Sequence, residues 1–442
     1  DFFESEGFAR GADAPGDRVY TEAAMVPHWV RGEEWAKLKH PLIGGREWDL
    51  NMLGLGGSVG TIGQPTAGPS GSIEAEVVVY ASIEEMQAHA ADVSGRVVVI
   101  AEGWANYGGT SRRTLSLRAA ELGAVAALLR SAGPFSLNSP HAGSTNTPGD
   151  QVVTAIPTAA LTVENAEMIG RMYDRCASPV GCIRIELYME ATYNQPGTEI
   201  PCRSDECAPS RNTIVDVVGS RFPNEVVLLS GHLDSWDVGF GAMDDGGGVF
   251  ISLQVCSMLK RLNIRPLRTV RCVGWTSEEM GSQGSRRYWA DHAGELEDFS
   301  VVFESDGGVF DTSGIGLSAS LEAHAIVRRV AMMLTDVSGK DGSTVAAGGG
   351  GPNLLHVVPI AVEDEEEESE ESEESEESEE PEQLTIVPVN VCVVAGDHAC
   401  IFHTIVECHG DVVASDLSSA LLPAIPWIGD SERAITCLND RA

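Results

Sequence analysis

Basic residues are scarce in this chain of 442 residues. Lysine and arginine together number 29 against 66 aspartates and glutamates, which gives a formal net charge of -37. Nucleic acids and anionic membranes attract proteins through Lys and Arg side chains. The composition therefore argues against both as partners, although acidity alone names no substrate.

Long apolar runs are also missing. No stretch approaches the roughly eighteen continuous apolar residues that a membrane span requires, and the opening residues lack the pattern expected of a signal peptide. Because the sequence begins at Asp1 without a methionine, we expect a processed or truncated start. The length suits two or three domains, and 43% hydrophobic residues is ordinary for globular proteins.

The ten cysteines lack the spacing of a zinc finger. We expect two local disulfides in a polar, turn-rich part of the chain, and therefore a secreted or lumenal location, whether extracellular, in the secretory pathway or lysosomal. The four cysteines concerned are Cys176, Cys182, Cys202 and Cys207. Cys256 and Cys272 are predicted instead to be small buried hydrophobic residues.

Two regions differ in their hydrophobic pattern. From Ile73 to about Leu187, strand-like runs such as IEAEVVVYA and GRVVVIA alternate with helical stretches such as SIEEMQAHAADV, which predicts a small mixed domain. After Arg211, longer apolar runs alternate with helical segments, which is typical of a largely parallel sheet covered on both faces. The strands expected there are EVVLLSGHL, TVRCVGWT, SVVFESD and VNVCVVAG, with a helix over GGGVFISLQVCSMLKRLNI.

Acidic and imidazole side chains follow three of these predicted strands. Sites in α/β sheets form beyond the carboxyl ends of the strands, so these side chains should lie close together. They are, in chain order, His232 with Asp234, Glu278 with Glu279, and Asp306. The turn MDDGGG brings Asp244 and Asp245 to the same edge at the start of the next helix.

Such a cluster favours a metal site. Neighbouring carboxylates repel one another unless a cation compensates them, and zinc suits a mixed set of histidine and carboxylates. Taken singly, a lone histidine, a DD pair at a helix start and an EE pair before glycine are common solvated or capping groups. Their occurrence at successive strand ends favours the metal, because independent surface residues have no reason to collect at one edge.

The segments GHLDSWDVGFGAMDDGGG, WTSEEMGSQGS and FESDGG closely resemble the co-catalytic zinc exopeptidases. The likeness extends upstream through VPHWVRGEE, LGLGGSVGT, SPHAG and LTVENAEM, and covers most of residues 18 to 345. It implies an α/β zinc-exopeptidase sandwich with a mostly parallel mixed sheet, plus an inserted smaller α+β domain of the protease-associated type. The domains would be residues 1–45 as the N-terminal segment of the peptidase domain, 46–205 as the insert, and 206–442 as the catalytic domain with a disordered acidic insert at 363–383.

The resemblance also implies how the residues divide two Zn²⁺ ions per chain. His232 and Asp306 would bind one zinc, Glu279 would bind the other, and Asp244 would bridge them. Glu278 would be the general base and Asp234 the second catalytic residue, hydrogen-bonded behind His232 to fix its tautomer. These roles describe hydrolysis of a peptide bond by a water that two metals activate.

The family has one more ligand, a late histidine in a segment that resembles HHSHGDT, where this chain has FHTIVECHGDVV. Aligning on His409 puts Glu407 in the ligand position, whereas aligning on His398 puts that position beside His403. Three carboxylates and one hydroxide already balance two zinc ions, so a neutral ligand, His403, is favoured. Glu407 and His409 are the alternatives.

The leading hypothesis is a zinc-dependent exopeptidase, of carboxypeptidase or dipeptidase type, that acts on dipeptides or short peptides. The main alternative is a catalytically impaired or inactive homologue that serves as a binding or structural module. A third hypothesis, an acidic calcium-binding surface protein, rests only on the Glu/Ser run at 363–383. A homodimer is expected by family analogy.

Overall fold

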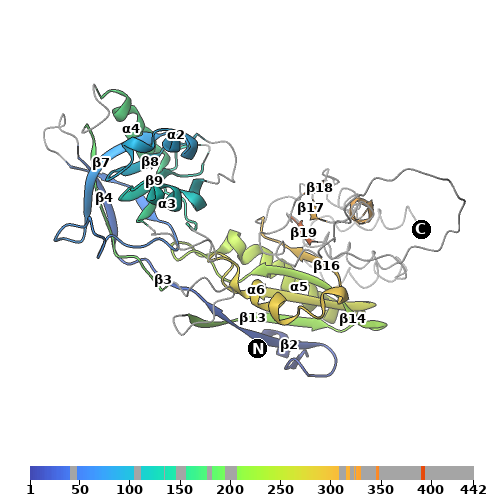
Figure 1. Cartoon of the computed structure of the whole chain (residues 1–442). Coiled ribbons are helices and arrows are strands. Elements are labelled where there is room, and N and C mark those ends of the chain that lie inside the picture. Colours follow the sequence, from blue (N-terminus) through green and yellow to red (C-terminus); the bar gives the residue numbers. More distant parts are fainter. Residues whose placement is uncertain are drawn as a thin grey trace, which may run out of the picture.

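The computed structural model describes residues 1–39, 47–103, 111–133, 135–145, 156–176, 182–194, 207–307, 315–318, 323, 325–329, 345–347 and 390–393. Within them, the strands gather in two large sheets that lie at opposite ends of the molecule (Figure 1). A two-stranded connection, β3 (His28–Val30) paired with β12 (Thr192–Asn194), lies between the two sheets.

The nine-stranded sheet has the order β1-β2-β13-β15-β14-β16-β19-β17-β18. Its neighbours β15, β14, β16 and β19 run parallel, whereas β13 is antiparallel to both β15 and β2. All four strands predicted after Arg211 belong to this mixed sheet. The bounds are β1 (Ala9–Arg10), β2 (Arg18–Val26), β13 (Ala208–Val217), β14 (Phe222–His232), β15 (Arg268–Trp275), β16 (Phe299–Glu304), β17 (Ile315–Ser318), β18 (Val345–Ala347) and β19 (Asn390–Val393).

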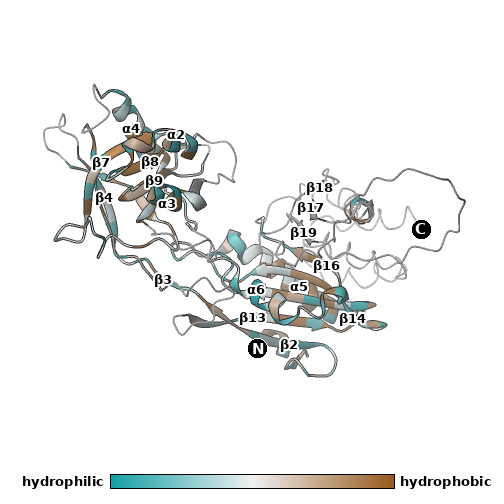
Figure 2. Cartoon of the chain, in the orientation of Figure 1, coloured by the Kyte–Doolittle hydropathy of each residue, from teal (hydrophilic) through white to brown (hydrophobic). Residues whose placement is uncertain are grey.

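Helices α5 and α6 cover opposite faces of this sheet. Successive residues of a strand point to opposite faces. Leu229 accordingly packs with Val255 of α5, while its neighbour Leu228 packs with Tyr288 of α6. The strands between the helices are strongly hydrophobic (Figure 2). The helical bounds here are α1 (Phe2–Ser5), α5 (Gly247–Arg261), α6 (Gln283–Asp291), a single π-helical turn (Ala242–Gly246) and a 3₁₀ turn (Leu296–Asp298).

The eight-stranded sheet has the order β5-β4-β11-β7-β8-β9-β10-β6, with β7 to β10 parallel. Ile169 of α4 packs on one face, and Met86 of α2 with Leu115 of α3 on the other. Ser82 caps α2 by accepting a hydrogen bond from the Glu85 N–H. The bounds are β4 (Glu34–Lys39), β5 (Glu47–Leu50), β6 (Met52–Gly54), β7 (Ile73–Tyr80), β8 (Val97–Ile100), β9 (Ala126–Arg130), β10 (Thr158–Leu161), β11 (Arg184–Met189), α2 (Ile83–Ala88), α3 (Ser111–Glu121), α4 (Val163–Asp174) and a 3₁₀ turn (Ala90–Asp92).

The clustered cysteines behave as expected where they are described. Cys176 and Cys182 form a disulfide between the end of α4 and the start of β11. Cys207 is also disulfide-bonded. Cys202 lies outside the described residues.

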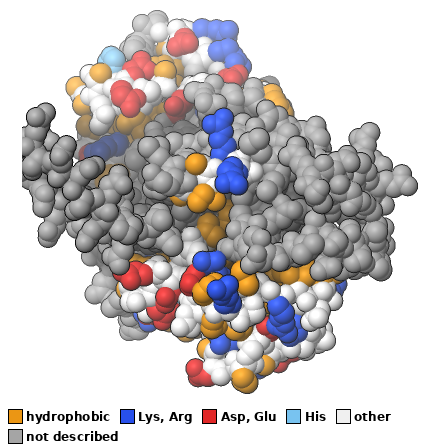
Figure 3. Space-filling model, turned by 90° about the vertical axis from the view of Figure 1, so that its right-hand side faces the viewer, with side chains coloured by type: hydrophobic (Ala, Val, Ile, Leu, Met, Phe, Trp, Pro, Cys, Tyr) orange, Lys and Arg blue, Asp and Glu red, His pale blue; other side chains and the backbone are white. Residues whose placement is uncertain are grey.

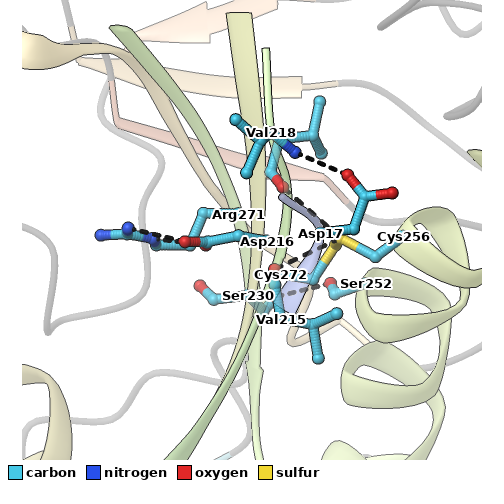
Figure 4. Close-up of a disulfide and its surroundings, with 10 residues drawn as sticks. Asp17, Val215, Asp216, Val218, Ser230, Ser252, Cys256, Arg271 and Cys272 are labelled. Atoms are coloured by element: carbon cyan, nitrogen blue, oxygen red, sulfur yellow. Dashed lines mark hydrogen bonds and ion pairs between the residues drawn. A yellow bond between two sulfur atoms is a disulfide. The ribbon is translucent and has the colours of Figure 1, made fainter. Parts of the chain in front are cut away.

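Cys256 and Cys272 require a correction. Both are fully buried, as predicted, but their sulfur atoms form a disulfide that joins α5 to β15 (Figure 4). Beside it, the fully buried Asp216 carboxylate accepts hydrogen bonds from Nε and Nη2 of Arg271, at 2.8 and 3.0 Å. The two cysteines are sixteen residues apart, one in a helix and one in a strand, so no local pattern predicts the disulfide. Only the packing of α5 on β15 brings the two sulfur atoms together.

Among the described helices, none combines the length and the apolar character needed to cross a bilayer. The face drawn in Figure 3 carries both acidic and basic side chains on its upper and lower parts. The net negative charge is therefore not gathered into one uniform acidic surface on the described part of that face.

Candidate metal centre

The predicted site residues that are described lie at one edge of the nine-stranded sheet. The strand β14 ends at His232, β15 leads into Glu278 and Glu279, and β16 leads into Asp306. Register explains the convergence, because His232 pairs with Trp275 and Ser230 pairs with Glu304 across parallel neighbours. The carboxyl ends of three adjacent strands therefore meet, as the sequence predicted.

His232 lies at the centre of this edge and is 1% exposed. Its Nδ1 atom lies 2.8 Å from the backbone carbonyl oxygen of Asp234. A carbonyl oxygen only accepts hydrogen bonds, so Nδ1 carries the proton and Nε2 is left as the ligand atom. Nε2 lies 3.1 Å from Oδ1 of Asp244 and 3.4 Å from Oδ1 of Asp306.

The Asp234 carboxylate does not make the hydrogen bond to His232 that the sequence analysis expected. Its Oδ1 atom lies 3.8 Å from Nδ1 of His232, beyond hydrogen-bond distance. The two carboxylate oxygens instead accept hydrogen bonds from the backbone N–H groups of Glu278 and Glu279, at 2.9 and 3.2 Å. The backbone of Asp234 thus sets the histidine tautomer, while its side chain holds the loop that carries the two glutamates.

Asp245 joins the end of β14 to the start of α5. Its fully buried carboxylate accepts hydrogen bonds from the backbone N–H groups of His232 at 3.0 Å and Gly248 at 3.1 Å. Glycine is needed on both sides, because a Cβ at Gly248 would overlap the Ser305 carbonyl and one at Gly231 would lie 2.5 Å from Asp245 Oδ2. Gly248 and Gly231 therefore allow the close approach of α5 to the ends of the strands.

Burial and repulsion between neighbouring carboxylates raise the pKa values of acidic residues in the cluster. Burial, followed by the charges of Asp244 and Glu278, raises the pKa of Glu279 to about 8. Burial also raises the pKa of Asp245 to about 8, with Asp306 adding to it. For His232, burial lowers the pKa, but hydrogen bonds to Asp244 and Asp306 outweigh it and raise the pKa to about 12. The carboxylates thus hold positive charge strongly at Nε2 of His232.

These donors fit a divalent cation. One ligand atom each from His232, Asp245 and Asp306 lies within 4.8 Å of the others. Both oxygens of Asp245 already accept backbone hydrogen bonds, so Asp244, whose Oδ1 is nearest to Nε2 of His232, is the better candidate. A buried Oε1 of Glu279 has no hydrogen-bond partner among the described residues, as expected for an oxygen that would bind a cation. Imidazole and carboxylates together suit zinc.

The late ligand candidates His403, Glu407 and His409 lie outside the described residues. The Glu/Ser run at 363–383, on which the calcium-binding hypothesis rests, lies outside them too. Neither prediction is tested by the structure.

Sequence reasoning gave no role to Glu304, the last residue of β16. It is fully buried, and neither carboxylate oxygen has a hydrogen-bond partner among the described residues. Burial, with the nearby charges of Glu278 and Asp306, raises its pKa to about 8. The signal in the sequence was a glutamate at the end of an apolar strand, two residues before Asp306.

The sequence of this chain is similar to those of known peptidases. Residues 212–345 match the family model of Peptidase family M28. The chain is 44% identical over 324 residues to carboxypeptidase Q of Xenopus laevis, a match that covers 73% of this chain and 63% of that protein. The chain thus spans less than two thirds of the length of this relative.

Solved structures support the fold. A Peptidase M28 precursor from Shewanella amazonensis SB2B superposes with a TM-score of 0.68 at 24% identity, covering 92% of this chain and 84% of that one. A zinc aminopeptidase from Bacillus subtilis superposes with a TM-score of 0.50 at 19% identity, covering 77% and 71%. In sequence, residues 212–345 match Peptidase family M28, and the chain is similar to carboxypeptidase Q over 73% of its length.

Proposed function

We propose that the chain is a zinc-dependent exopeptidase that hydrolyses dipeptides or short peptides. The observation that carries the proposal is the convergence of Asp244 and Asp306 on Nε2 of the buried His232, at 3.1 and 3.4 Å. The similarity to carboxypeptidase Q supports peptide hydrolysis, and a zinc aminopeptidase of similar fold supports the choice of zinc.

The proposed division of ligands follows the described donors. His232 and Asp306 would hold one zinc, Glu279 would hold a second, and Asp244 would bridge the two. When bound, the ions would supply an acidified water and a Lewis acid for the scissile carbonyl. The fifth ligand is proposed to be His403, with Glu407 and His409 as alternatives, because a neutral donor leaves the charge of the site balanced.

The side chains of this chain would then position and move the proton. Glu278 would accept the proton of the attacking water and deliver it to the leaving amine. Asp234 would fix where Glu278 sits, since its carboxylate holds the Glu278 N–H at 2.9 Å. The Asp234 carbonyl would hold the Nδ1–H of His232, so that in the neutral ring Nε2 is the nitrogen that faces the metal.

The test is amino-acid release from a panel of dipeptides by purified protein with added Zn²⁺. The wild type should release product, and Glu278→Gln should retain its zinc while losing at least about a hundredfold in kcat, since general-base catalysis contributes about 10² to 10⁴. Identical behaviour of the two proteins, with no product from any dipeptide, would sink the proposal.

The alternative of an inactive homologue makes the opposite forecast for the same experiment. It expects one weakly held zinc per chain and no product from wild-type protein. Metal analysis by mass spectrometry separates the two, because the catalytic proposal needs about two zinc ions per chain.

Three further expectations belong to this proposal. Residues 46–205 are proposed to be an inserted domain of the protease-associated type. A secreted or lumenal location is supported by the disulfides Cys176–Cys182 and Cys256–Cys272, since disulfides persist in oxidising compartments. A homodimer is proposed by family analogy alone.

A further inference from the structure

The loop that follows His232 is held by residues from outside the nine-stranded sheet. Nε and Nη2 of Arg31 donate hydrogen bonds to the two carboxylate oxygens of Asp237, each at 2.8 Å. Arg31 follows β3, the strand that connects the two sheets, whereas Asp237 lies three residues after Asp234. A paired, two-pronged bond of this kind fixes the direction of both partners as well as their distance.

Arg31 is itself held rigidly. Nη1 donates to the Gly54 carbonyl oxygen at 2.5 Å and lies 3.3 Å from Oε1 of Glu34, and the guanidinium lies over the Trp29 ring, 4.8 Å from its centroid. The side chain is only 11% exposed. The Arg31 hydrogen bond keeps the pKa of Asp237 below its ordinary value, so the pair is charged at neutral pH.

A second contact fixes the residue next to Asp237. The ring of Trp236 occupies the space that a side chain at Gly56 would fill, so that a Cβ there would overlap the ring. A Cβ at Gly56 would also lie 3.4 Å from Sδ of Met280, the residue after Glu279. The backbone after β6 therefore lies close to both loops that carry the candidate metal site, and only glycine leaves room for the Trp236 ring.

We propose that Arg31 and Gly56 are positioning residues for the metal site, acting through Asp237 and Trp236 on the loop at 233–241. That loop begins one residue after His232 and contains Asp234, whose carboxylate holds the Glu278 and Glu279 amides. The lobe built on the eight-stranded sheet and its connection thereby orient the zinc-binding side chains without touching the metal. The inference rests on the proposed zinc site.

The first test compares Arg31→Lys and Asp237→Asn with wild type in zinc affinity, measured by competition with a chromogenic chelator. Lys keeps the charge but cannot form the two-pronged bond. Each variant should weaken zinc binding about tenfold or more, the usual size of effects transmitted through a ligand's supporting residues. The double variant should be little worse than either single one, because both remove the same contact.

A matched control is Arg265→Lys, which breaks an equally close contact to Asp17, at 2.8 and 2.9 Å, remote from the site. It should lower the thermal midpoint while leaving zinc affinity and the absorption spectrum of the Co²⁺-loaded protein unchanged. Arg31→Lys should shift that spectrum. Should Arg31→Lys and Arg265→Lys both leave metal affinity and spectrum unchanged, the positioning role is excluded.

The second test introduces Gly56→Ala, whose added methyl displaces Trp236. Zinc affinity should fall as in Arg31→Lys, and the second substitution Trp236→Leu should restore much of it by making room. Gly294→Ala is the control, because nothing lies within 4 Å of a Cβ there. Unchanged zinc affinity in Gly56→Ala would overturn the proposal.

Failure of this inference is distinguishable from failure of the proposed function. His232→Ala should abolish tight zinc binding whatever holds the loop. If it does so while Arg31→Lys binds zinc like wild type, only the positioning role is wrong. If His232→Ala binds zinc like wild type, the metal site itself is wrong.

Discussion

His232 is oriented by the backbone of Asp234, through a hydrogen bond of 2.8 Å from Nδ1–H to the carbonyl oxygen. Replacing the Asp234 side chain leaves this bond in place, so the histidine tautomer should survive such a substitution. What the side chain holds is the backbone of Glu278 and Glu279. The two functions of one residue can therefore be separated by mutation.

We expect Asp234→Ala to lower kcat/KM about 10- to 100-fold, because the loop that carries the proposed general base loses both of its carboxylate contacts. Asp234→Asn keeps one acceptor oxygen and should fall between this variant and wild type. Steady-state kinetics on a dipeptide measures both. Asp291→Ala, an exposed acid on α6 paired with Arg287, is the control and should change kcat/KM less than twofold. Equal rates for Asp234→Ala and wild type would contradict the role given to this carboxylate.

Removal of metal should inactivate and destabilise the protein. Dialysis against a chelator should abolish dipeptide hydrolysis and lower the thermal midpoint, since a ligand that binds only the folded state stabilises it. Added Zn²⁺ should restore both properties.

The zinc content of variants, measured by mass spectrometry, identifies the late ligand. Of the variants His403→Ala, Glu407→Ala and His409→Ala, we expect His403→Ala to reduce the zinc content from about two ions per chain to about one. A loss confined to Glu407→Ala or His409→Ala would assign that residue instead.

The Cys256–Cys272 disulfide should contribute to the stability of the nine-stranded sheet. It closes a loop of sequence separation 16 and joins α5, which follows Asp244, to β15, which precedes Glu278. Cys256→Ala with Cys272→Ala should cost about 2 to 4 kcal/mol of unfolding free energy. Denaturant unfolding followed by tryptophan fluorescence measures it. The control pair Cys176→Ala with Cys182→Ala closes a loop of separation 6 and should cost less. A larger loss from the control pair would contradict this ranking.

Stability should also respond to the ionisation of His292. A hydrogen bond to Glu22, opposed by burial and helped by Glu295, raises the pKa of His292 above its ordinary value. A raised folded-state pKa gives stability that is fully present below the unfolded value and is lost as pH rises through the folded value. The thermal midpoint of wild type should therefore exceed that of His292→Gln most at about pH 6. The gap should narrow as pH rises through the folded-state pKa, and a gap that widened would show that the histidine is neutral in the folded protein.

Much of the site could be predicted because strand ends are visible in a sequence. Apolar runs that stop at His232, before Glu278 and before Asp306 locate the edge of a parallel sheet, and neighbouring parallel strands bring their carboxyl ends together. The partner of the Asp234 carboxylate could not be predicted. Its choice between His232 and the backbone of Glu278 depends on a distance of 3.8 against 2.9 Å, which no periodicity encodes.

The sequence by itself determined the mixed α/β character, the order of the strands in the chain and the residue types available to bind a cation. Hydrophobic periodicity and glycine placement act locally, so they can be read without the fold. Only the tertiary structure decided that Cys256 meets Cys272 and that Arg31 meets Asp237, residues separated by 16 and 206 positions. Such pairings follow from how whole helices and sheets pack, and packing is a property of the complete fold.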